Sequence, residues 1–265
     1  MTSSLPRPRK SLGQHFLTDP NIIRKIIALA DLRPDETVLE IGPGRGALTG
    51  ALCRAVKTVV AVEVDANLGE YLSRTFSNVH NLDLRIGDAL EFPFESLSAG
   101  TVVVANLPYN ISTPILFRLL ESRHRFDRLI LMLQTEVARR LVAKPGGKTY
   151  GSLSVSMQRW TVPSLAFTVS PGCFHPPPEV GSAVVKLEVR KDSLIEPADD
   201  AHFLRIVRAA FAHRRKTLTN SLRDAGLDPD AITRGLADAG IEGSRRAETL
   251  SPDEFVTLAR AITLP

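Results

Sequence analysis

The sequence predicts an α/β protein with a mostly parallel sheet, an antiparallel hairpin at one sheet edge, and a small C-terminal helical domain. Three observations support this prediction. Five short apolar runs are separated mostly by helix-like segments, two later segments alternate between apolar and polar residues, and the tail of the chain shows only helical periodicity.

The five apolar runs are short, as the strands of a parallel sheet usually are. The helix-like segments between most of them provide the long crossovers that neighbouring parallel strands require. The predicted strands are residues 37–41, 58–62, 82–86, 101–105 and 128–133.

Two later segments, residues 152–160 and 182–189, have a loop between them instead of a clear helix. We expect them to pair as the hairpin that closes one sheet edge. Helix starts are marked by the Asp19-Pro20 pair and by a capping box in residues 251–254.

A polar stretch with a proline, residues 190–200, separates the strand pattern from the helical tail. We therefore predict one domain over residues 1–190 and a helical domain over residues 191–265. The chain has 265 residues, enough for one substantial core and a smaller second unit.

The composition is that of a globular protein, with 43% hydrophobic residues and a formal charge of +4. Cys53 and Cys173 are too few for a disulfide framework and lack metal-ligand spacing, which predicts a reduced compartment and no metal. No uncharged apolar run is long enough to cross a bilayer, and the basic N-terminus leads into no apolar signal region. We expect a cytoplasmic protein that acts away from membranes.

A glycine-rich turn follows the first predicted strand, in the sequence VLEIGPGRGALT. Gly42, Gly44 and Gly46 lack β-carbons, so the backbone can turn tightly there and approach a ligand closely. The dinucleotide fingerprint places its last glycine one residue later, next to a pyrophosphate, so this shorter loop favours a ligand without pyrophosphate. A simple tight turn between strand and helix is the alternative.

Two acidic residues follow the next two strands. Glu63 lies 21 positions after Gly42, where an acidic side chain accepts hydrogen bonds from both ribose hydroxyls, and Asp88 ends the third strand. Each could instead be a helix cap or a solvated loop carboxylate. Because the carboxyl ends of parallel strands meet at one crevice, the glycine turn and both acids can contact a single adenosine.

The fourth strand ends in Asn106, Leu107, Pro108 and Tyr109. Proline disfavours helical geometry for Leu107, which leaves two acceptors, the Asn106 amide oxygen and the Leu107 carbonyl. Two acceptors can orient the amine of an adenine while a methyl sulfonium approaches, and the proton is then lost to solvent. Tyr109 would stack on the target base, although ordinary core packing is the alternative.

The stretch from residue 201 to 223 contains no acidic residue. Its cations are either a solvated helix face or contacts to nucleic-acid phosphates, and an adenine-directed pocket favours the second interpretation. The candidate RNA-binding residues are Arg205, Arg208, Arg214, Arg215 and Lys216.

The chain resembles the bacterial small-subunit rRNA adenine dimethyltransferases from residue 11 to about residue 258. This resemblance implies a Rossmann-like class I methyltransferase sheet, S-adenosyl-L-methionine as cofactor, and two adjacent adenosines near the 3′ end of 16S rRNA in the small ribosomal subunit as substrate. The segments that carry it are SLGQHFL, EIGPGRG, NLPYNIS, CFHPPPEVGSAV, FAHRRKTLTNSL and AETLSPDEF.

The resemblance also implies roles for individual residues. Phe174 is expected to cover the target base opposite Tyr109. Many relatives carry aspartate where this chain has Gly181, and often asparagine where it has His15. The residues implied to contact the cofactor are His15, Leu17, Gly42, Gly44, Glu63, Asp88 and Asn106.

Rival functions remain open at this point. The large-subunit rRNA adenine methyltransferases share the fold and an N-x-P-Y tetrad, whereas DNA adenine methyltransferases commonly have two prolines in that tetrad. A non-catalytic or dual-role assembly factor of the small subunit is a further alternative, and the glycine spacing disfavours a dinucleotide oxidoreductase. No feature indicates an obligate dimer, so we expect a monomer.

Overall fold

The computed structural model describes residues 5–9, 12–191 and 199–262. The chain divides into two compact units. The first comprises Met1–Ala138 and Ser164–Val189, and the second comprises Arg139–Pro163 and Arg190–Pro265.

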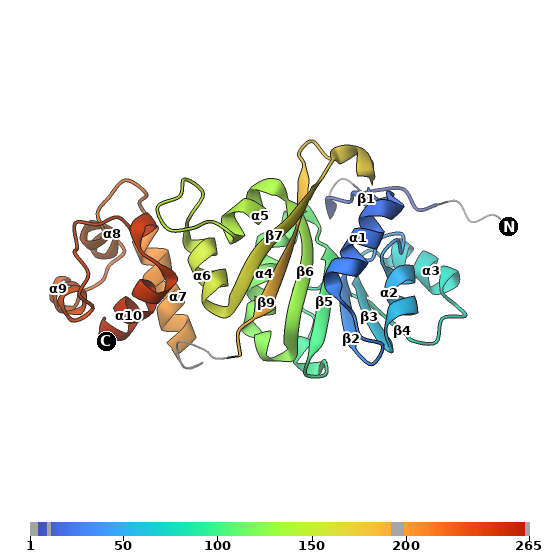
Figure 1. Cartoon of the computed structure of the whole chain (residues 1–265), viewed down its shortest axis with the longest axis horizontal. Coiled ribbons are helices and arrows are strands. Elements are labelled where there is room, and N and C mark those ends of the chain that lie inside the picture. Colours follow the sequence, from blue (N-terminus) through green and yellow to red (C-terminus); the bar gives the residue numbers. More distant parts are fainter. Residues whose placement is uncertain (1–4, 10–11, 192–198, 263–265) are drawn as a thin grey trace. The chain divides into compact units, whose positions relative to one another are not determined.

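A seven-stranded sheet forms the centre of the first unit (Figure 1). Its strand order is β4-β3-β2-β5-β6-β9-β7, and the pairs β4-β3, β3-β2, β2-β5 and β5-β6 are parallel, whereas β9 runs antiparallel to β6. The strands are β2 (Thr37–Ile41), β3 (Thr58–Glu63), β4 (Leu82–Ile86), β5 (Thr101–Asn106), β6 (Phe126–Gln134), β7 (Thr161–Val169) and β9 (Ser182–Val189).

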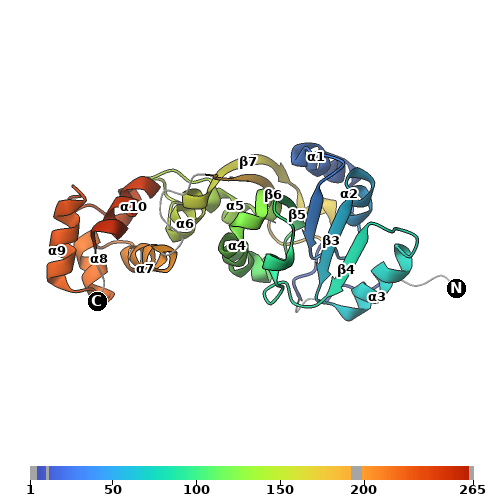
Figure 2. The same cartoon turned by 90° about the horizontal axis from the view of Figure 1, so that it is seen from below.

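The five predicted parallel strands are confirmed, and all of them but the edge strand β4 bury most of their side chains. Figure 2 shows α1 and α2 on one side of this sheet and α4 on the other. The predicted Asp19 cap is also confirmed, since its side chain accepts a hydrogen bond from Asn21 N–H. The helices of this unit are α1 (Pro20–Ala30), α2 (Thr49–Ala55), α3 (Ala66–Thr75) and α4 (Ser112–Glu121), and α5 (Thr135–Leu141) follows β6.

The predicted edge hairpin is only half right. Residues 182–189 form β9, but Ser152–Trp160 is helix α6, and the second edge strand is β7. Helix α6 is buried on nearly all sides, with Val155 and Met157 at 0% exposure, so it has no polar face to reveal a helical period. Its alternating sequence therefore imitates a strand.

The second unit has its own apolar core. Tyr150 and Val155, which precede the edge strands in sequence, are buried in this core together with residues of the tail such as Phe203. The sequence predicted a single boundary at residue 190, whereas the structure groups residues 139–163 with the tail. The packing of these residues depends on contacts distant in sequence. The helices of the tail are α7 (Asp200–Ala210), α8 (Leu218–Asp224), α9 (Pro229–Asp238) and α10 (Pro252–Ala261).

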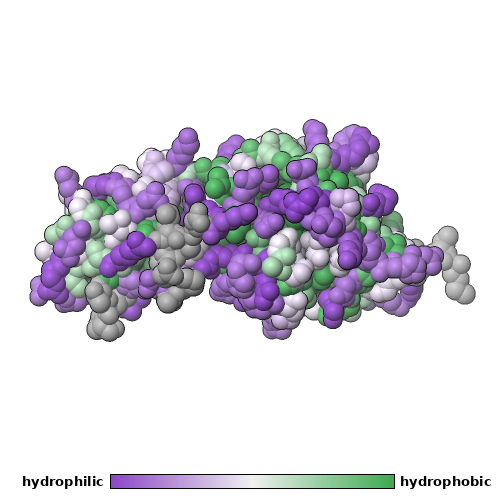
Figure 3. Space-filling model, turned by 60° about the horizontal axis from the view of Figure 1, so that its bottom comes forward, coloured by the Kyte–Doolittle hydropathy of each residue, from purple (hydrophilic) through white to green (hydrophobic). Residues whose placement is uncertain are grey.

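The capping box predicted at the start of α10 is confirmed, because Ser251 Oγ accepts from Glu254 N–H and Glu254 accepts from Ser251 N–H. Hydrophilic residues cover most of the face seen in Figure 3. Among the described residues, no helix has the length and apolar character needed to span a membrane.

A small antiparallel sheet ties the N-terminal segment to a distant loop. Strand β1 (Phe16–Leu17) pairs with β8 (Phe174–His175), so Leu17 lies opposite Phe174. Thr18 N–H also donates to the Cys173 carbonyl over 2.9 Å. These bonds bring the GQHFL segment and the FHPPP loop together.

We predict that Gly46→Ala destabilises the first unit more than Gly100→Ala does. Both glycines have positive φ, +81° and +80°, so each substitution costs about 1–2 kcal/mol of backbone strain. A Cβ at Gly46 would lie only 2.5 Å from Phe76 Cε2, whereas at Gly100 its nearest neighbour would be 3.8 Å away. Urea unfolding of both variants measures the difference, and equal losses of unfolding free energy would contradict the close packing at Gly46.

Candidate functional site

A pocket lies where the sheet reverses its winding direction. From β2 the chain moves outward through β3 and β4, then returns to the other side of β2 with β5 and β6. The loops at the carboxyl ends of β2 and β5 therefore diverge and leave a crevice, the usual ligand site of such sheets. Residues that follow β2, β3, β4 and β5 line this pocket, together with the N-terminal residues 12–17.

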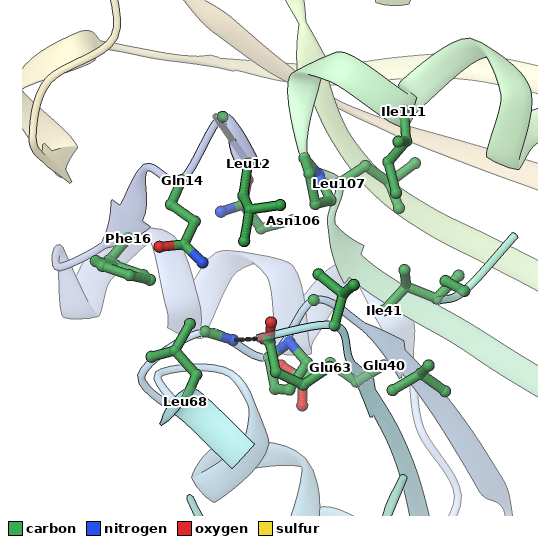
Figure 4. Close-up of a pocket in the computed structure, with 18 of the residues that line it drawn as sticks. Leu12, Gln14, Phe16, Glu40, Ile41, Glu63, Leu68, Asn106, Leu107 and Ile111 are labelled. Atoms are coloured by element: carbon green, nitrogen blue, oxygen red, sulfur yellow. Dashed lines mark hydrogen bonds between the residues drawn. The ribbon is translucent and has the colours of Figure 1, made fainter. Parts of the chain in front are cut away.

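The glycine turn forms one wall. Gly42, Gly44 and Gly46 all have positive φ, at +68°, +58° and +81°, which explains why glycine is required there. Gly44 N–H donates a 3.0 Å hydrogen bond to Glu63 Oε2, drawn as a dashed line in Figure 4. The turn and the end of β3 thus form one rigid element.

Glu63 is almost fully buried, at 3% exposure, and both its oxygens are held by backbone donors. Oε2 accepts from Gly44 N–H, and Oε1 accepts from Asp65 N–H over 3.0 Å. Burial raises the pKa of Glu63, and these two N–H groups oppose the rise. Each carboxylate oxygen has a further lone pair, so the side chain can still accept two hydroxyl groups from a ligand in the pocket.

Sequence reasoning missed Glu40, a second buried acid that lines the pocket. Thr49 Oγ1 donates to Glu40 Oε2 over 2.6 Å. Burial raises the pKa of Glu40 to about 8, and the nearby Glu63 contributes to the rise. Glu40 lies inside an apolar run before the glycine turn, so the sequence pattern indicated only a strand residue.

Asp88 lies at the rim of the same pocket and is exposed. Its Oδ1 accepts from Leu90 N–H over 2.8 Å, which is the local turn bond expected of a loop aspartate. One oxygen of Asp88 therefore behaves as that of an ordinary loop carboxylate. The other oxygen accepts no hydrogen bond from the described residues.

Asn106 is oriented by the N-terminal segment. Its Nδ2 donates to the His15 carbonyl over 3.1 Å, which leaves Oδ1 as an acceptor for a ligand. Leu107 N–H donates to the Met132 carbonyl on β6, whereas the Leu107 carbonyl has no hydrogen-bond partner in the described parts of the chain. The predicted pair of acceptors is thus present at the end of β5.

Pro108 starts the turn that leads away from these acceptors. Its carbonyl accepts from Ile111 N–H and from Ser112 Oγ, so the chain enters a 3₁₀ turn, Tyr109–Ile111, and then α4. Tyr109 is half-buried and lines the pocket, and its hydroxyl lies 2.6 Å from Ser182 Oγ. Core packing alone therefore does not explain Tyr109.

Phe174 is not at the pocket, contrary to the expectation that it lies opposite Tyr109. Its pairing with Leu17 turns the ring inward, where it is 4% exposed in the core formed by the sheet and α1. The ring beside Tyr109 is that of His15, with centroids 5.4 Å apart. His15 Nδ1 also hydrogen-bonds the Pro176 carbonyl over 2.8 Å.

The N-terminal segment forms the remaining wall and is fastened to the glycine turn. Figure 4 shows Leu12, Gln14 and Phe16 on one side of the pocket and Glu63 on the other. The Arg45 guanidinium lies over the Phe16 ring at 4.4 Å and donates to the Pro6 carbonyl over 2.7 Å. Leu17 is buried and also lines the pocket.

The lining of the pocket is suited to an adenosine-containing cofactor. Glu63 offers acceptors for a ribose diol, and apolar residues such as Leu68 and Val64 provide walls for a base. The described residues contain no group of three or more His, Cys, Asp or Glu side chains that could hold a metal ion.

The basic residues of the tail lie on α7 and the turn after it, and all five predicted residues are exposed. Arg214 donates to the Lys148 carbonyl, and Lys216 pairs with Asp224. Arg215 has no ion-pair or hydrogen-bond partner in the described part of the chain.

We predict that Glu40→Gln makes the unfolding free energy less dependent on pH. The folded carboxyl has a pKa of about 8 instead of 4.5, so its stabilising contribution is complete below pH 4.5 and is lost as pH rises through about 8. The amide does not titrate and can still accept from Thr49.

Urea unfolding between about pH 5 and pH 8 measures this effect, with exposed Glu91→Gln as the matched control. The Glu40 variant should gain stability relative to the wild type as the pH rises. The same pH dependence in both proteins would contradict a protonated Glu40.

Residues 6–264 match the family described as ribosomal RNA adenine dimethylase. The "Ribosomal RNA small subunit methyltransferase A" of Moorella thermoacetica is 46% identical, covering 96% of this chain and 92% of that protein. The protein of the same name from Syntrophotalea carbinolica is 47% identical and covers 97% of both chains.

Two solved structures are similar along almost the whole chain. A dimethyladenosine transferase from Plasmodium falciparum has a TM-score of 0.80 at 27% identity, covering 92% of this chain and 96% of that one. The 23S rRNA methyltransferase ErmE has a TM-score of 0.72 at 26% identity, covering 93% and 99%. The sheet is thus the predicted Rossmann-like class I methyltransferase sheet, and the chain belongs to the ribosomal RNA adenine dimethylase family.

Proposed function

We propose that this protein transfers methyl groups from S-adenosyl-L-methionine to N6 of two adjacent adenosines near the 3′ end of 16S rRNA, giving N6,N6-dimethyladenosines. The observation that carries the proposal is a pair of acceptors beside a pocket suited to adenosine, Asn106 Oδ1 and the Leu107 carbonyl, which accept no hydrogen bond from the residues that the structure describes. The small-subunit rRNA substrate is supported by the names of relatives that are 46–47% identical.

The cofactor would lie against the glycine turn. Glu63 would accept hydrogen bonds from the two ribose hydroxyls of the cofactor. Asp88 would accept a hydrogen bond from its adenine amine at the edge of the pocket. Gly42 and Gly44 allow the backbone to approach the ligand, and His15 and Leu17 close the pocket from the N-terminal side. S-adenosyl-L-methionine supplies an electrophilic methyl group when it is bound.

The protein's task is to prepare the target amine. The lone pair of an adenine N6 is delocalised into the ring, which makes the amine a poor nucleophile. Asn106 Oδ1 and the Leu107 carbonyl would each accept a hydrogen bond from one N–H of this amine. These bonds would orient the nitrogen lone pair toward the methyl group. Neither is a strong base, so the proton passes to solvent after transfer.

Tyr109 would provide the stacking surface for the extruded base, which repays part of the cost of unstacking it from RNA. We propose a different role for Phe174 from the one that the family resemblance implied. Because its ring is buried, it would support the loop beside the pocket through β8 instead of covering the base directly.

The exposed cations of the tail would contact rRNA phosphates and hold the small subunit, and we propose that the protein acts as a monomer. Phosphate contacts position the enzyme without reading sequence, so the choice of base is left to the pocket. This division of labour also accommodates a role in small-subunit assembly, because binding does not require methyl transfer.

The first test is transfer of radiolabelled methyl from S-adenosyl-L-methionine to small ribosomal subunits that lack the modification. Asn106→Ala removes one of the two acceptors and should lower the transfer rate by about 100-fold or more. The expected product is N6,N6-dimethyladenosine confined to small-subunit rRNA, identified after nuclease digestion.

Large ribosomal subunits and DNA are incubated in parallel as alternative substrates. Label on either would reassign the substrate, and tight binding to small subunits without transfer would indicate an assembly factor. An Asn106→Ala variant as active as the wild type would contradict the assigned chemistry.

We further predict that Arg215→Gln weakens binding to small subunits and lowers the slope of log affinity against log salt by about 1. Arg215 is exposed and has no partner in the described part of the chain, so its charge is available to a phosphate. Arg234→Gln on α9, an exposed cation outside the acid-free stretch, is the matched control. Filter binding at several salt concentrations measures the affinity and the slope for each variant. Equal slopes for Arg215→Gln and the wild type would contradict the phosphate contact.

A further inference from the structure

Ser182 contacts Tyr109 of the pocket, and although it lies within the CFHPPPEVGSAV segment, the sequence indicated no role for its side chain. It is the first residue of β9, pairs in register with Gln134 at the end of β6, and is 0% exposed. The adjacent Gly181 carbonyl accepts from Thr135 N–H over 2.9 Å, which secures the backbone just before it. Its hydroxyl is therefore held at the start of an interior strand, which lies between β6 and β7.

Tyr109, by contrast, lies on a short turn with few restraints. The 3₁₀ turn Tyr109–Ile111 has only three residues, and the ring is half-buried, so packing alone leaves it room to move. Within the described part of the chain, the far end of the ring has one polar contact, the 2.6 Å hydrogen bond between the Tyr109 hydroxyl and Ser182 Oγ. The His15 ring, 5.4 Å away and tilted by 32°, is its aromatic neighbour.

We propose that Ser182 is a positioning residue that sets the orientation of the Tyr109 ring, and thereby favours the second of the two methyl transfers. This inference rests on the proposed function. Before the first transfer, two N–H groups can be held by Asn106 Oδ1 and the Leu107 carbonyl. The monomethylated amine retains one N–H, so only one of these hydrogen bonds remains and stacking on Tyr109 provides more of the alignment.

Burial supports the persistence of this bond. It raises the pKa of Tyr109, with the Ser182 hydrogen bond acting in the opposite direction, so the phenol stays protonated at neutral pH. A protonated phenol and a serine hydroxyl can exchange donor and acceptor roles without losing the contact. The Tyr109 ring is thus oriented by two neutral hydroxyl groups, its own and that of Ser182.

The test uses Ser182→Ala, Tyr109→Phe and the double variant in single-turnover transfer to unmodified small subunits. Each single substitution removes the same hydrogen bond, and Tyr109→Phe keeps the ring. We expect the second transfer to slow by about five-fold, the factor for a lost hydrogen bond of about 1 kcal/mol, with a smaller effect on the first. N6-monomethyladenosine should therefore accumulate.

The double variant separates positioning from a general effect on folding. If Ser182 acts through the Tyr109 hydroxyl, Ser182→Ala causes no further loss in the Tyr109→Phe background. A full additional loss there, or an unchanged ratio of mono- to dimethyladenosine in Ser182→Ala, would overturn the inference. Ser164→Ala, on edge strand β7, controls for removal of a serine hydroxyl from the sheet.

A second measurement needs no substrate. The chain has three tyrosines, so 3-fluorotyrosine labelling gives three ¹⁹F resonances, and Tyr109→Phe identifies the one from Tyr109. Ser182→Ala should shift that resonance and leave the other two in place, and an unmoved resonance would overturn the inference. Absence of transfer by the wild type would instead count against the proposed function, while the resonance would still decide the positioning role.

Discussion

The burial of the Glu63 carboxylate is the constraint on which the pocket depends. A charge with 3% exposure is stable only if hydrogen-bond donors surround it, and here the donors are backbone N–H groups of Gly44 and Asp65. Gly44 can present its N–H because the turn after β2 adopts positive φ. One acid therefore fixes the loops after two neighbouring strands and keeps its remaining lone pairs directed to a ligand.

The same requirement extends to the N-terminal segment. Asp65, also buried, accepts from Gln14 Nε2 and pairs with Arg9, so the acid that helps hold Glu63 also holds the segment covering the pocket. Asn106 then donates to the His15 carbonyl in that segment. The orientation of the amide at the end of β5 thus depends on residues about 90 positions earlier, and the pocket is complete only when the segment is in place.

Short-range sequence patterns were reliable where one strand or one helix start decided the structure. The five parallel strands are short apolar runs, buried except at the edge strand β4, and the caps at Asp19 and Ser251 use the side chains expected. The pattern failed for Ser152–Trp160, because a helix buried on all sides shows no polar face. It also gave no sign that residues 139–163 join the core of the tail.

The sequence alone determined the parallel sheet, the glycine turn, the acids at the strand ends and the Asn-Leu-Pro-Tyr tetrad, because each depends on local backbone preferences and on the fixed order of strand ends. Only the tertiary structure decided which side chains face the pocket. It turned Phe174 into the core through pairing with Leu17, brought His15 and Ser182 to Tyr109, and buried Glu40 beside Glu63. These contacts join residues far apart in the chain, and strand register and burial, which no local pattern encodes, determine them.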